Sequence, residues 1–469
     1  MKASFAFAAA AAVAVNAAAT PARIEARASE ASSGSLPAVT VKGNAFFAGN
    51  ERFYIRGIDY QPGGSSDAAD GSDPLADVQA CTRDIAKFKE LGVNTVRVYT
   101  VDNSKSHDQC MSMLADAGIY LALDVNSPNY SLNREEPAGS YNDVYLQSVF
   151  ATIDAFHKYS NTLLFFSGNE VINADNNTNC APYIKATTRD MKSYINSMGY
   201  RKIPVGYSAA DVESNRYDLA TYMNCGTEDQ RSDFFAFNDY SWCDPDSSFT
   251  ISGWDAKVKQ YGDYSIPLFL SEYGCIENKR NFEEVSTLYS SQMTSVYSGG
   301  LVYEYSEEGS GYGLVTISGN SVKPKSDFNF LKQQFAKTQS GGDGGYKSSG
   351  SPSECPKRSS TWEVKDFLGP ALPSMPEGAK KYIGKGAGKA PGLHGDGSQW
   401  ATDGQSQGTA VPGSGAVASG SSSSASGAAS SATAEGAASS VFRGDATLMP
   451  FLACGATVFF SMFFGAAML

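Results

Sequence analysis

The sequence predicts an α/β fold for its folded part, a (β/α)8 or TIM barrel over residues 38–337. Short runs rich in β-branched and aromatic residues alternate there with longer amphipathic stretches, which is the pattern of repeated βα units. No G-x-G-x-x-G or P-loop motif follows any expected strand, whereas an open doubly wound sheet usually carries a glycine-rich phosphate loop. A closed barrel therefore accounts for the pattern better than an open sheet.

Eight barrel strands are expected, each a short apolar run bounded by polar or turn-forming residues. In chain order they are 53–60, 94–100, 119–126, 162–170, 202–208, 234–240, 267–274 and 301–306. Helical periodicity fills most of the gaps, as at 81–91 and 182–198. In such a barrel the active site lies at the carboxyl ends of the strands, so polar residues that close an apolar run are the candidates for function.

The two ends of the chain have the patterns of targeting signals. Residues 1–19 combine one lysine, an uncharged alanine-rich run and small residues before an expected cleavage near Ala19, as in a secretory signal peptide. Residues 448–469 are uncharged, and small residues at 436–438 and a mostly polar spacer at 439–447 precede them. This pattern indicates a GPI-attachment signal, with Gly436 as the attachment residue and 437–469 removed; a plain membrane helix is the alternative.

Between the barrel and this tail the composition changes twice. Residues 338–400 are rich in glycine and proline but contain Cys355, Trp362 and Phe367, so we expect this extension to dock onto the barrel. Residues 401–436 are expected to form a disordered stalk. Ser, Ala and Gly occur 12, 11 and 7 times in 401–440, and such a stretch cannot bury enough apolar surface to fold.

Charge and cysteine usage exclude several classes of partner. With 37 Lys+Arg against 49 Asp+Glu the net charge is −12, so no nucleic-acid partner is expected. Export would place the cysteines in an oxidising compartment. No C-x-x-C pair occurs and the chain has only 3 histidines, so neither a metal site nor a cofactor is expected.

Two glutamates close two of the expected strands. Glu170 ends the fourth strand, directly after Asn169, and Glu272 ends the seventh. Taken alone, a glutamate at a strand end is more often solvated or salt-bridged than catalytic. Two of them on strands that face each other across the barrel mouth suit cleavage of a glycosidic bond, in which one carboxylic acid protonates the leaving oxygen and a second carboxylate attacks the anomeric carbon.

Aromatic and hydrogen-bonding residues close the other strands, as the faces and hydroxyls of a sugar require. The segments are YQPGG at 60–64, RVY at 97–99, DVN at 124–126, GNEVIN at 168–173, FNDYSWC at 237–243 and SEYGC at 271–275. Together they resemble fungal glycoside hydrolase family 72, the GPI-anchored β-1,3-glucanosyltransferases of the cell wall. The resemblance covers 37–399 and implies a secreted protein at the outer face of the plasma membrane or in the wall.

The resemblance implies a retaining double displacement on β-1,3-glucan. The enzyme would cleave one chain internally and transfer the fragment to the non-reducing end of another. Glu170 would be the general acid/base and Glu272 the nucleophile, with carboxyls about 5–5.5 Å apart. One carboxyl must then hold a proton while the other is ionised, and we expect Glu170 to hold it. Residue types alone leave two alternatives, a hydrolytic endo-β-1,3-glucanase and a non-catalytic wall protein that binds glucan.

The same resemblance implies which residues hold the glucan. Donor sugars would contact Tyr99, Asn126, Asn169 and Tyr303, with Gln61, Asp124 and Tyr240 as neighbours. Asn169 would bind the 2-hydroxyl, a contact that strengthens in the transition state. Asp211 and Arg216 match positions near the acceptor sugar; without the family they would be taken for a surface ion pair of little energetic value.

The resemblance also implies the disulfides. It pairs Cys81–Cys110, Cys225–Cys355 and Cys243–Cys275, and it leaves Cys180 unpaired. No cysteine occurs between 356 and 453, so the chain resembles the members that lack a cysteine-rich glucan-binding module. N-glycosylation sequons lie at Asn129 and Asn176. We expect a monomer.

Overall fold

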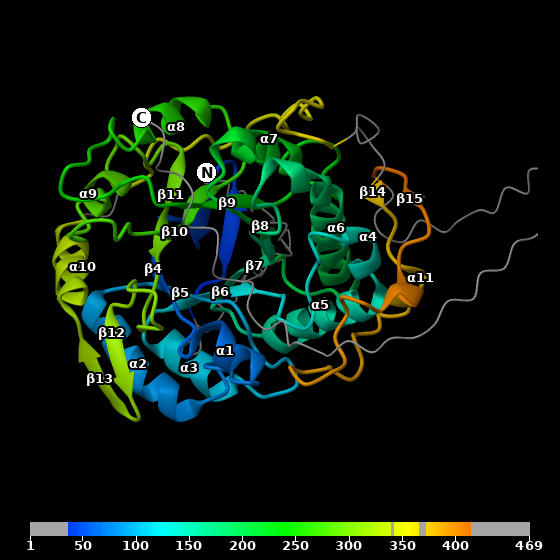
Figure 1. The fold of residues 1–469 in the computed structure, drawn as a ribbon, viewed down its shortest axis with the longest axis horizontal. Coiled ribbons are helices and arrows are strands. Elements are labelled where there is room, and N and C mark those ends of the chain that lie inside the picture. Colours follow the sequence, from blue (N-terminus) through cyan, green and yellow to red (C-terminus); the bar gives the residue numbers. More distant parts are fainter. Residues whose placement is uncertain (1–35, 339–341, 365–371, 414–469) are drawn as a thin grey trace, which may run out of the picture. The chain divides into compact units, whose positions relative to one another are not determined.

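The centre of the molecule is a closed barrel of parallel strands (Figure 1). The computed structural model describes residues 36–338, 342–364 and 372–413. The barrel order is β10-β11-β4-β5-β6-β7-β8-β9, and every neighbouring pair is parallel. The strands are β4 (Ile55–Asp59), β5 (Thr95–Val98), β6 (Tyr120–Asp124), β7 (Thr162–Asn169), β8 (Val205–Ala209), β9 (Phe234–Asp239), β10 (Leu268–Tyr273) and β11 (Tyr297–Val302). The predicted (β/α)8 barrel is confirmed.

Helices connect the strands and pack against their outer faces. α2 begins where the Asp77 side chain accepts hydrogen bonds from the backbone of Gln79 and Ala80, and it ends at Gly92 in the left-handed conformation. The helices are α1 (Gly64–Ala69), α2 (Val78–Leu91), α3 (Asp108–Asp116), α4 (Pro137–Ser140), α5 (Asp143–Phe156), η1 (Asp175–Cys180), α6 (Ala181–Ser197), α7 (Glu213–Met223), α8 (Trp254–Gln260), α9 (Glu284–Leu288) and α10 (Ser326–Lys337).

A small antiparallel sheet precedes the barrel and was not predicted. It consists of β1 (Val39–Lys42), β2 (Ala45–Ala48) and β3 (Glu51–Phe53). Phe46 is fully buried, and its ring lies 6.2 Å from that of Phe234 and 6.0 Å from that of Phe269. These aromatic residues belong to one core cluster with residues from the beginnings of several barrel strands. The sheet therefore closes the amino-terminal end of the barrel, opposite the expected active site.

The eighth barrel strand lies earlier in the chain than predicted. The prediction placed it at 301–306, whereas β11 is Tyr297–Val302. Glycine at 299 and 300 favours a turn when the sequence is considered alone. In the structure Gly299 adopts φ 88°, and a Cβ there would lie 2.1 Å from the Ile55 carbonyl oxygen. The glycine thus allows β11 to approach β4 closely where the barrel closes. A hairpin of β12 (Val315–Ser318) and β13 (Ser321–Pro324) follows.

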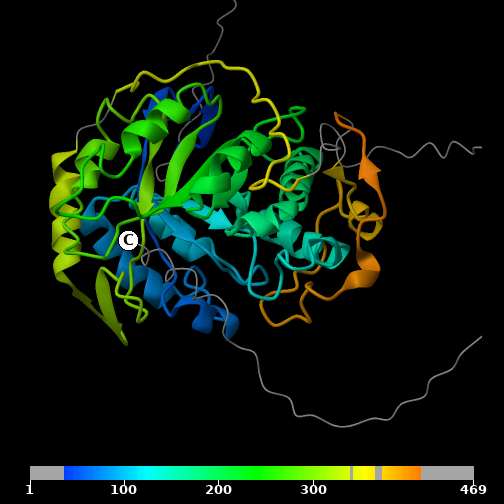
Figure 2. The same cartoon turned by 45° about the horizontal axis from the view of Figure 1, so that its top comes forward.

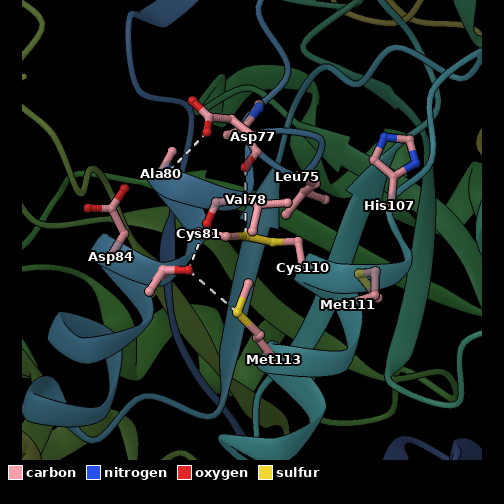
Figure 3. The surroundings of a disulfide bond; sticks show 12 residues. Leu75, Asp77, Val78, Ala80, Cys81, Asp84, His107, Cys110, Met111 and Met113 are labelled. Carbon is pink, nitrogen blue, oxygen red and sulfur yellow. Dashed lines mark hydrogen bonds between the residues drawn. A yellow bond between two sulfur atoms is a disulfide. The ribbon is translucent and has the colours of Figure 1, made fainter. Parts of the chain in front are cut away.

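Three disulfides form among the described residues, and they have the pairing that the resemblance implies. Cys81 of α2 is joined to Cys110 of α3, as Figure 3 shows beside the Asp77 cap. Cys243–Cys275 links the loops after β9 and β10, and Cys225–Cys355 spans 130 residues. Cys180 is free and buried, and burial raises the pKa of its thiol to about 11. Because the thiolate is the reactive form, this cysteine is poorly suited to redox or nucleophilic chemistry.

The extension after the barrel packs against it, coloured yellow to orange in Figure 2. Trp362 is fully buried with its ring 5.5 Å from that of Tyr222. Further on, α11 (Glu377–Lys380) packs on α5, and Asn142 Nδ2 donates to the Ser398 carbonyl oxygen at 2.7 Å. The packed region also continues past residue 401, where the stalk was expected to begin. η3 (Thr402–Gly404) lies there, and β15 (Thr409–Ala410) pairs with β14 (Leu372–Pro373).

The expected signal peptide at 1–19, the stalk from residue 414 onward, the attachment residue Gly436 and the segment 437–469 lie outside the described residues. Within the described part of the chain, no helix is long and apolar enough to cross a membrane.

Candidate active site

The carboxyl ends of the barrel strands contain a buried polar layer. Val98 of β5 belongs to the core between strands and helices, so strand alternation directs the side chain of Arg97 into the barrel. Arg97 reaches across the interior, where its Nη1 donates to the Ser271 carbonyl oxygen of β10 at 3.2 Å. Glu170, just after β7, and Glu272, within β10, both lie at this end of the barrel.

Three donors surround the carboxylate of Glu272. The Tyr99 hydroxyl donates to Oε1 at 2.8 Å and the Tyr240 hydroxyl donates to Oε2 at 2.7 Å. Arg97 Nη1 lies 3.5 Å from Oε1, and the Glu272 side chain is only 10% exposed. Hydrogen bonds and a positive charge stabilise the ionised form, and contacts to both oxygens fix the direction of the carboxylate.

The ionisation of Glu272 is shifted by its surroundings. Burial and the nearby charge of Glu170 raise the pKa of Glu272 to about 7, against the opposing effect of Arg97, Tyr240 and Tyr99. We expected Glu170 to be the carboxyl whose environment favours the protonated form, but the raised pKa belongs to Glu272. The reason is that Glu272 lies deeper in the barrel, where loss of solvent outweighs its three donors.

Glu170 is held in an unusual backbone conformation. Its φ is 49°, in the left-handed region, which costs a residue other than glycine on the order of 1–3 kcal/mol. The Glu170 N–H donates to the Ser208 carbonyl oxygen at 2.9 Å, and Arg134 Nη2 donates to the Glu170 carbonyl oxygen at 2.7 Å. The side chain accepts a hydrogen bond at Oε1 from Asn238 Nδ2 at 2.7 Å. The turn after β7 is therefore fixed on both sides, and so is the carboxyl.

Arg97 is a functional residue that the sequence analysis did not single out. It is fully buried, and it makes two hydrogen bonds to Asp124, at 2.9 and 3.2 Å. Its guanidinium lies 4.3 Å from the ring centre of Tyr99 and 4.4 Å from that of Phe166. Asp124, predicted as a neighbour of the donor sugar, is a buried partner of Arg97, which in turn lies beside Glu272. A lone arginine within an apolar strand was the signal that could have identified the pair, because a buried charge requires a partner.

Two of the predicted amide side chains use their carbonyl oxygens within the protein. Gln61 Oε1 accepts from the backbone N–H of Tyr99 at 3.2 Å and of Thr100 at 3.0 Å. Asn126 Oδ1 accepts from the Tyr145 hydroxyl at 2.8 Å. Gln61 therefore supports the segment that carries Tyr99, one of the donors to Glu272.

Aromatic rings form one side of the site. The Tyr312 ring lies 5.5 Å from that of Tyr240 and 5.3 Å from that of Tyr303. Tyr240 and Tyr303 were predicted to contact the substrate, and the structure brings them together around Tyr312, which was not predicted. Tyr240 also donates to Glu272, so this cluster lies beside the carboxylate. A sugar ring that stacks on these side chains would lie next to Glu272.

The predicted acceptor residues form an ion pair in which the two partners differ in exposure. The Arg216 side chain is 5% exposed and the Asp211 side chain 32%, and Arg216 Nη1 donates to Asp211 Oδ1. The guanidinium of Arg216 lies 4.8 Å from the ring centre of Phe237. Both residues line a cavity of about 590 Å³ together with Tyr217 and Lys257. Asp211 is therefore accessible to a ligand, whereas Arg216 mainly fixes Asp211.

The remaining candidate sites can be placed as well. Asn129 and Asn176, the two sequon residues, are both exposed, and Asn129 Nδ2 donates to the Leu393 carbonyl oxygen at 2.9 Å. Among the described residues, Cys243, Cys275 and Glu277 have ligand atoms within 4.8 Å of one another. Both sulfurs belong to one disulfide, so they cannot bind a metal as thiolates. A cavity of about 670 Å³ beside α6 contains none of the predicted site residues.

The fold and the site define a class, the barrel enzymes that act on carbohydrate with two glutamates at the mouth of the barrel. The family model for glycoside hydrolase family 72, described as glucanosyltransferase, matches residues 28–339. The chain belongs to this family.

Named relatives and solved structures are similar over most of the chain. The 1,3-beta-glucanosyltransferase gel1 of Aspergillus fumigatus is 65% identical over 359 residues, which are 76% of this chain and 78% of that protein. The 1,3-beta-glucanosyltransferase GAS5 of Saccharomyces cerevisiae is 53% identical over 374 residues, 78% of this chain and 76% of that protein. A solved structure of a Saccharomyces cerevisiae Gas2p mutant in complex with laminaritetraose and laminaripentaose has a TM-score of 0.64 at 41% identity, and the match covers 71% of this chain and 76% of that chain.

Proposed function

We propose that this protein is a β-1,3-glucanosyltransferase that elongates glucan by a retaining double displacement. The observation that carries the proposal is the arrangement at Glu272, a carboxylate held by Arg97, Tyr99 and Tyr240 beside a second glutamate. Family membership and the named relatives support β-1,3-glucan as both donor and acceptor. Neither a metal nor a cofactor takes part in the proposed reaction.

In the first step Glu272 is the nucleophile and Glu170 the acid. A Glu272 oxygen attacks the anomeric carbon, the bond to the leaving glucan oxygen breaks, and the Glu170 proton passes to that oxygen. Burial raises the pKa of Glu272 to about 7, so the attacking carboxylate forms as pH rises through 7, and Arg97, Tyr99 and Tyr240 hold it in place. The leaving oxygen must receive its proton from the other carboxyl of the site, so we assign the acid role to Glu170.

In the second step an acceptor replaces the leaving chain. Glu170, now ionised, takes the proton from the hydroxyl at the non-reducing end of another glucan. That oxygen displaces Glu272 from the anomeric carbon. Two inversions retain the β configuration. Asn169 would bind the donor 2-hydroxyl, and Asp211 would bind the acceptor. The rest of the donor chain would be bound by Tyr99, Asn126, Tyr240 and Tyr303.

The fate of the intermediate is open to direct measurement. With a borohydride-reduced laminarioligosaccharide, we expect products longer than the substrate, because a sugar hydroxyl and not water resolves the intermediate. Mass spectrometry of the time course separates the two outcomes. If only shorter products appear at every substrate concentration, the protein is a hydrolytic glucanase and the transferase proposal is wrong.

We also propose that the exported enzyme acts at the outer face of the plasma membrane through a GPI anchor at Gly436. The uncharged tail, the small residues before it and the polar spacer support this location. The serine-rich segment beyond the docked extension would separate the barrel from the membrane. Release of the protein from intact cells by a phosphatidylinositol-specific phospholipase would be the direct test of this anchor; retention in the membrane would favour a spanning helix.

A further inference from the structure

Two buried serines meet inside the barrel although their strands are not neighbours. Ser208 lies in β8 and Ser271 in β10, and β9 runs between these two strands. Both side chains are fully buried, and their Oγ atoms lie 2.8 Å apart. The barrel interior is the place where such strands can bring side chains together. Neither hydroxyl takes part in the proposed double displacement.

Each serine also contacts an asparagine of the site. The Ser208 hydroxyl donates to Asn169 Oδ1 at 2.7 Å, and the Ser271 hydroxyl donates to Asn238 Oδ1 at 2.9 Å. Asn238 Nδ2 in turn donates to Glu170 Oε1 at 2.7 Å. The chain of contacts therefore runs from Asn169 through both serines to Asn238 and the predicted acid/base.

The hydroxyl protons determine how the two amides are oriented. An amide can rotate by half a turn, exchanging its oxygen and its NH2 group, unless its neighbours distinguish them. A hydroxyl that donates to the amide oxygen favours this orientation, because in the rotated form the hydroxyl would have to turn its proton away and accept from the NH2 group. With Ser208 and Ser271 donating, the NH2 group of Asn238 faces Glu170, and that of Asn169 remains available for a ligand.

The serine pair has two protons for three close oxygen contacts. Both amide oxygens receive a proton only when each serine donates outward, to its own asparagine. If either serine donates only to the other, one buried amide oxygen loses its partner, at a cost of about 1–3 kcal/mol. Outward donation by both serines would leave the 2.8 Å contact between the two hydroxyls without a proton. The Ser208 proton is therefore shared between Asn169 Oδ1 and Ser271 Oγ, whereas the Ser271 proton goes to Asn238 Oδ1. Each serine then governs one amide, and the two effects can be separated by mutation.

We propose that Ser208 and Ser271 are positioning residues, Ser208 for the asparagine that receives the donor 2-hydroxyl and Ser271 for the asparagine that holds Glu170. This inference rests on the proposed function. It adds two residues whose side-chain hydroxyls contact each other and two asparagines. We call the chain of contacts from Asn169 through Ser208 and Ser271 to Asn238 the relay. Through it, one buried pair of hydroxyls positions both the asparagine that binds the sugar and the asparagine that holds the acid/base.

Ser208→Ala tests the first half. We expect it to lower kcat/KM for 4-nitrophenyl β-laminaribioside by about tenfold, the effect of one lost hydrogen bond. For a substrate that lacks the 2-hydroxyl on the ring next to the leaving group, the substitution should lower kcat/KM much less. The preference for the 2-hydroxyl should therefore fall, while the pH profile stays in place because Ser271 still donates to Asn238.

Ser271→Ala should give the opposite result. Without its donor, Asn238 can rotate and turn its oxygen toward the Glu170 carboxyl, which disfavours the ionised acid/base. The alkaline limb of kcat/KM against pH should move upward by about 1–2 pH units, as expected for one lost hydrogen bond to a charged group. The preference for the 2-hydroxyl should remain as in the wild type.

Ser167→Ala is the matched control. Ser167 is fully buried in β7, and its hydroxyl contacts that of Thr188 at 2.8 Å and the Gly206 carbonyl oxygen at 3.0 Å. Asn126 contacts only the backbone carbonyl oxygen of Ser167, which the substitution keeps. Ser167→Ala should change neither the preference for the 2-hydroxyl nor the pH profile of kcat/KM. Equal effects of Ser208→Ala and Ser271→Ala on both readouts, or no effect on either, would overturn the relay. Such a result would leave the proposed function intact, since that proposal depends on the fate of the glucan.

Discussion

Glu272→Gln is expected to abolish turnover while the protein still binds laminarioligosaccharides. The amide is not a nucleophile for the anomeric carbon, so the glucanosyl intermediate cannot form. Gln keeps the shape of the side chain and one acceptor for Tyr99. Turnover is followed by product analysis and binding by calorimetry. Wild-type turnover in this variant would remove Glu272 from the mechanism.

The same substitution is expected to stabilise the fold above pH 7. Burial raises the pKa of Glu272 from 4.5 to about 7, so the folded state loses stability as pH rises from 4.5 through 7. The shift lowers the free energy of unfolding at high pH by roughly 2–4 kcal/mol. The Gln variant does not lose this stability, because its side chain carries no charge to bury. The melting temperature at pH 8 should therefore be at least that of the wild type, which separates a catalytic loss from misfolding.

Glu284→Gln is the matched control for this prediction. Glu284 is also buried, in α9, and burial with the nearby Asp244 raises its pKa to about 8. It should gain stability at pH 8 for the same reason as Glu272→Gln, yet retain transfer activity. If both variants lost activity equally, general damage to buried carboxyls would explain the result better than a role as nucleophile.

The sequence predicts the barrel well because its strands differ sharply from their surroundings. The apolar runs before Glu170 and Glu272 have polar residues at their carboxyl ends, which identifies both a strand and the end of it that faces the site. The start of β11 was missed because Gly299 and Gly300 resemble a turn. The sheet β1–β3 was missed because its strands are only 3–4 residues long and are interrupted by charges.

Contacts across the barrel could not be predicted from local pattern. Asp124 ends its strand like a sugar ligand, and only the approach of β5 to β6 shows that it neutralises Arg97. Ser208 and Ser271 are ordinary strand residues in the sequence, and their meeting depends on how the closed barrel aligns β8 with β10. The docking of 401–410 depends likewise on β14, which is far from β15 in the chain and pairs with it through Leu372–Ala410 and Pro373–Thr409.

Glu170→Gln is expected to show which half of the reaction each glutamate serves. Turnover of laminarioligosaccharides should fall by about 10²–10⁴, because the leaving oxygen no longer receives a proton. A substrate with a good leaving group, such as 2,4-dinitrophenyl β-laminaribioside, needs no such proton. The first step of the reaction with this substrate should remain fast, so dinitrophenol appears in a burst. The covalent intermediate then reacts slowly in the second step.

A small anionic nucleophile should complete the reaction in this variant. Azide needs no general base, so it should accelerate turnover of the Glu170→Gln protein and yield a laminaribiosyl azide of β configuration. Retention follows because Glu272 has already inverted the centre once. An α-azide, or no acceleration, would contradict the assignment of Glu170. Glu228→Gln is the control, because its side chain is 83% exposed before β9, at the opposite end of the barrel, and should show neither the burst nor the azide effect.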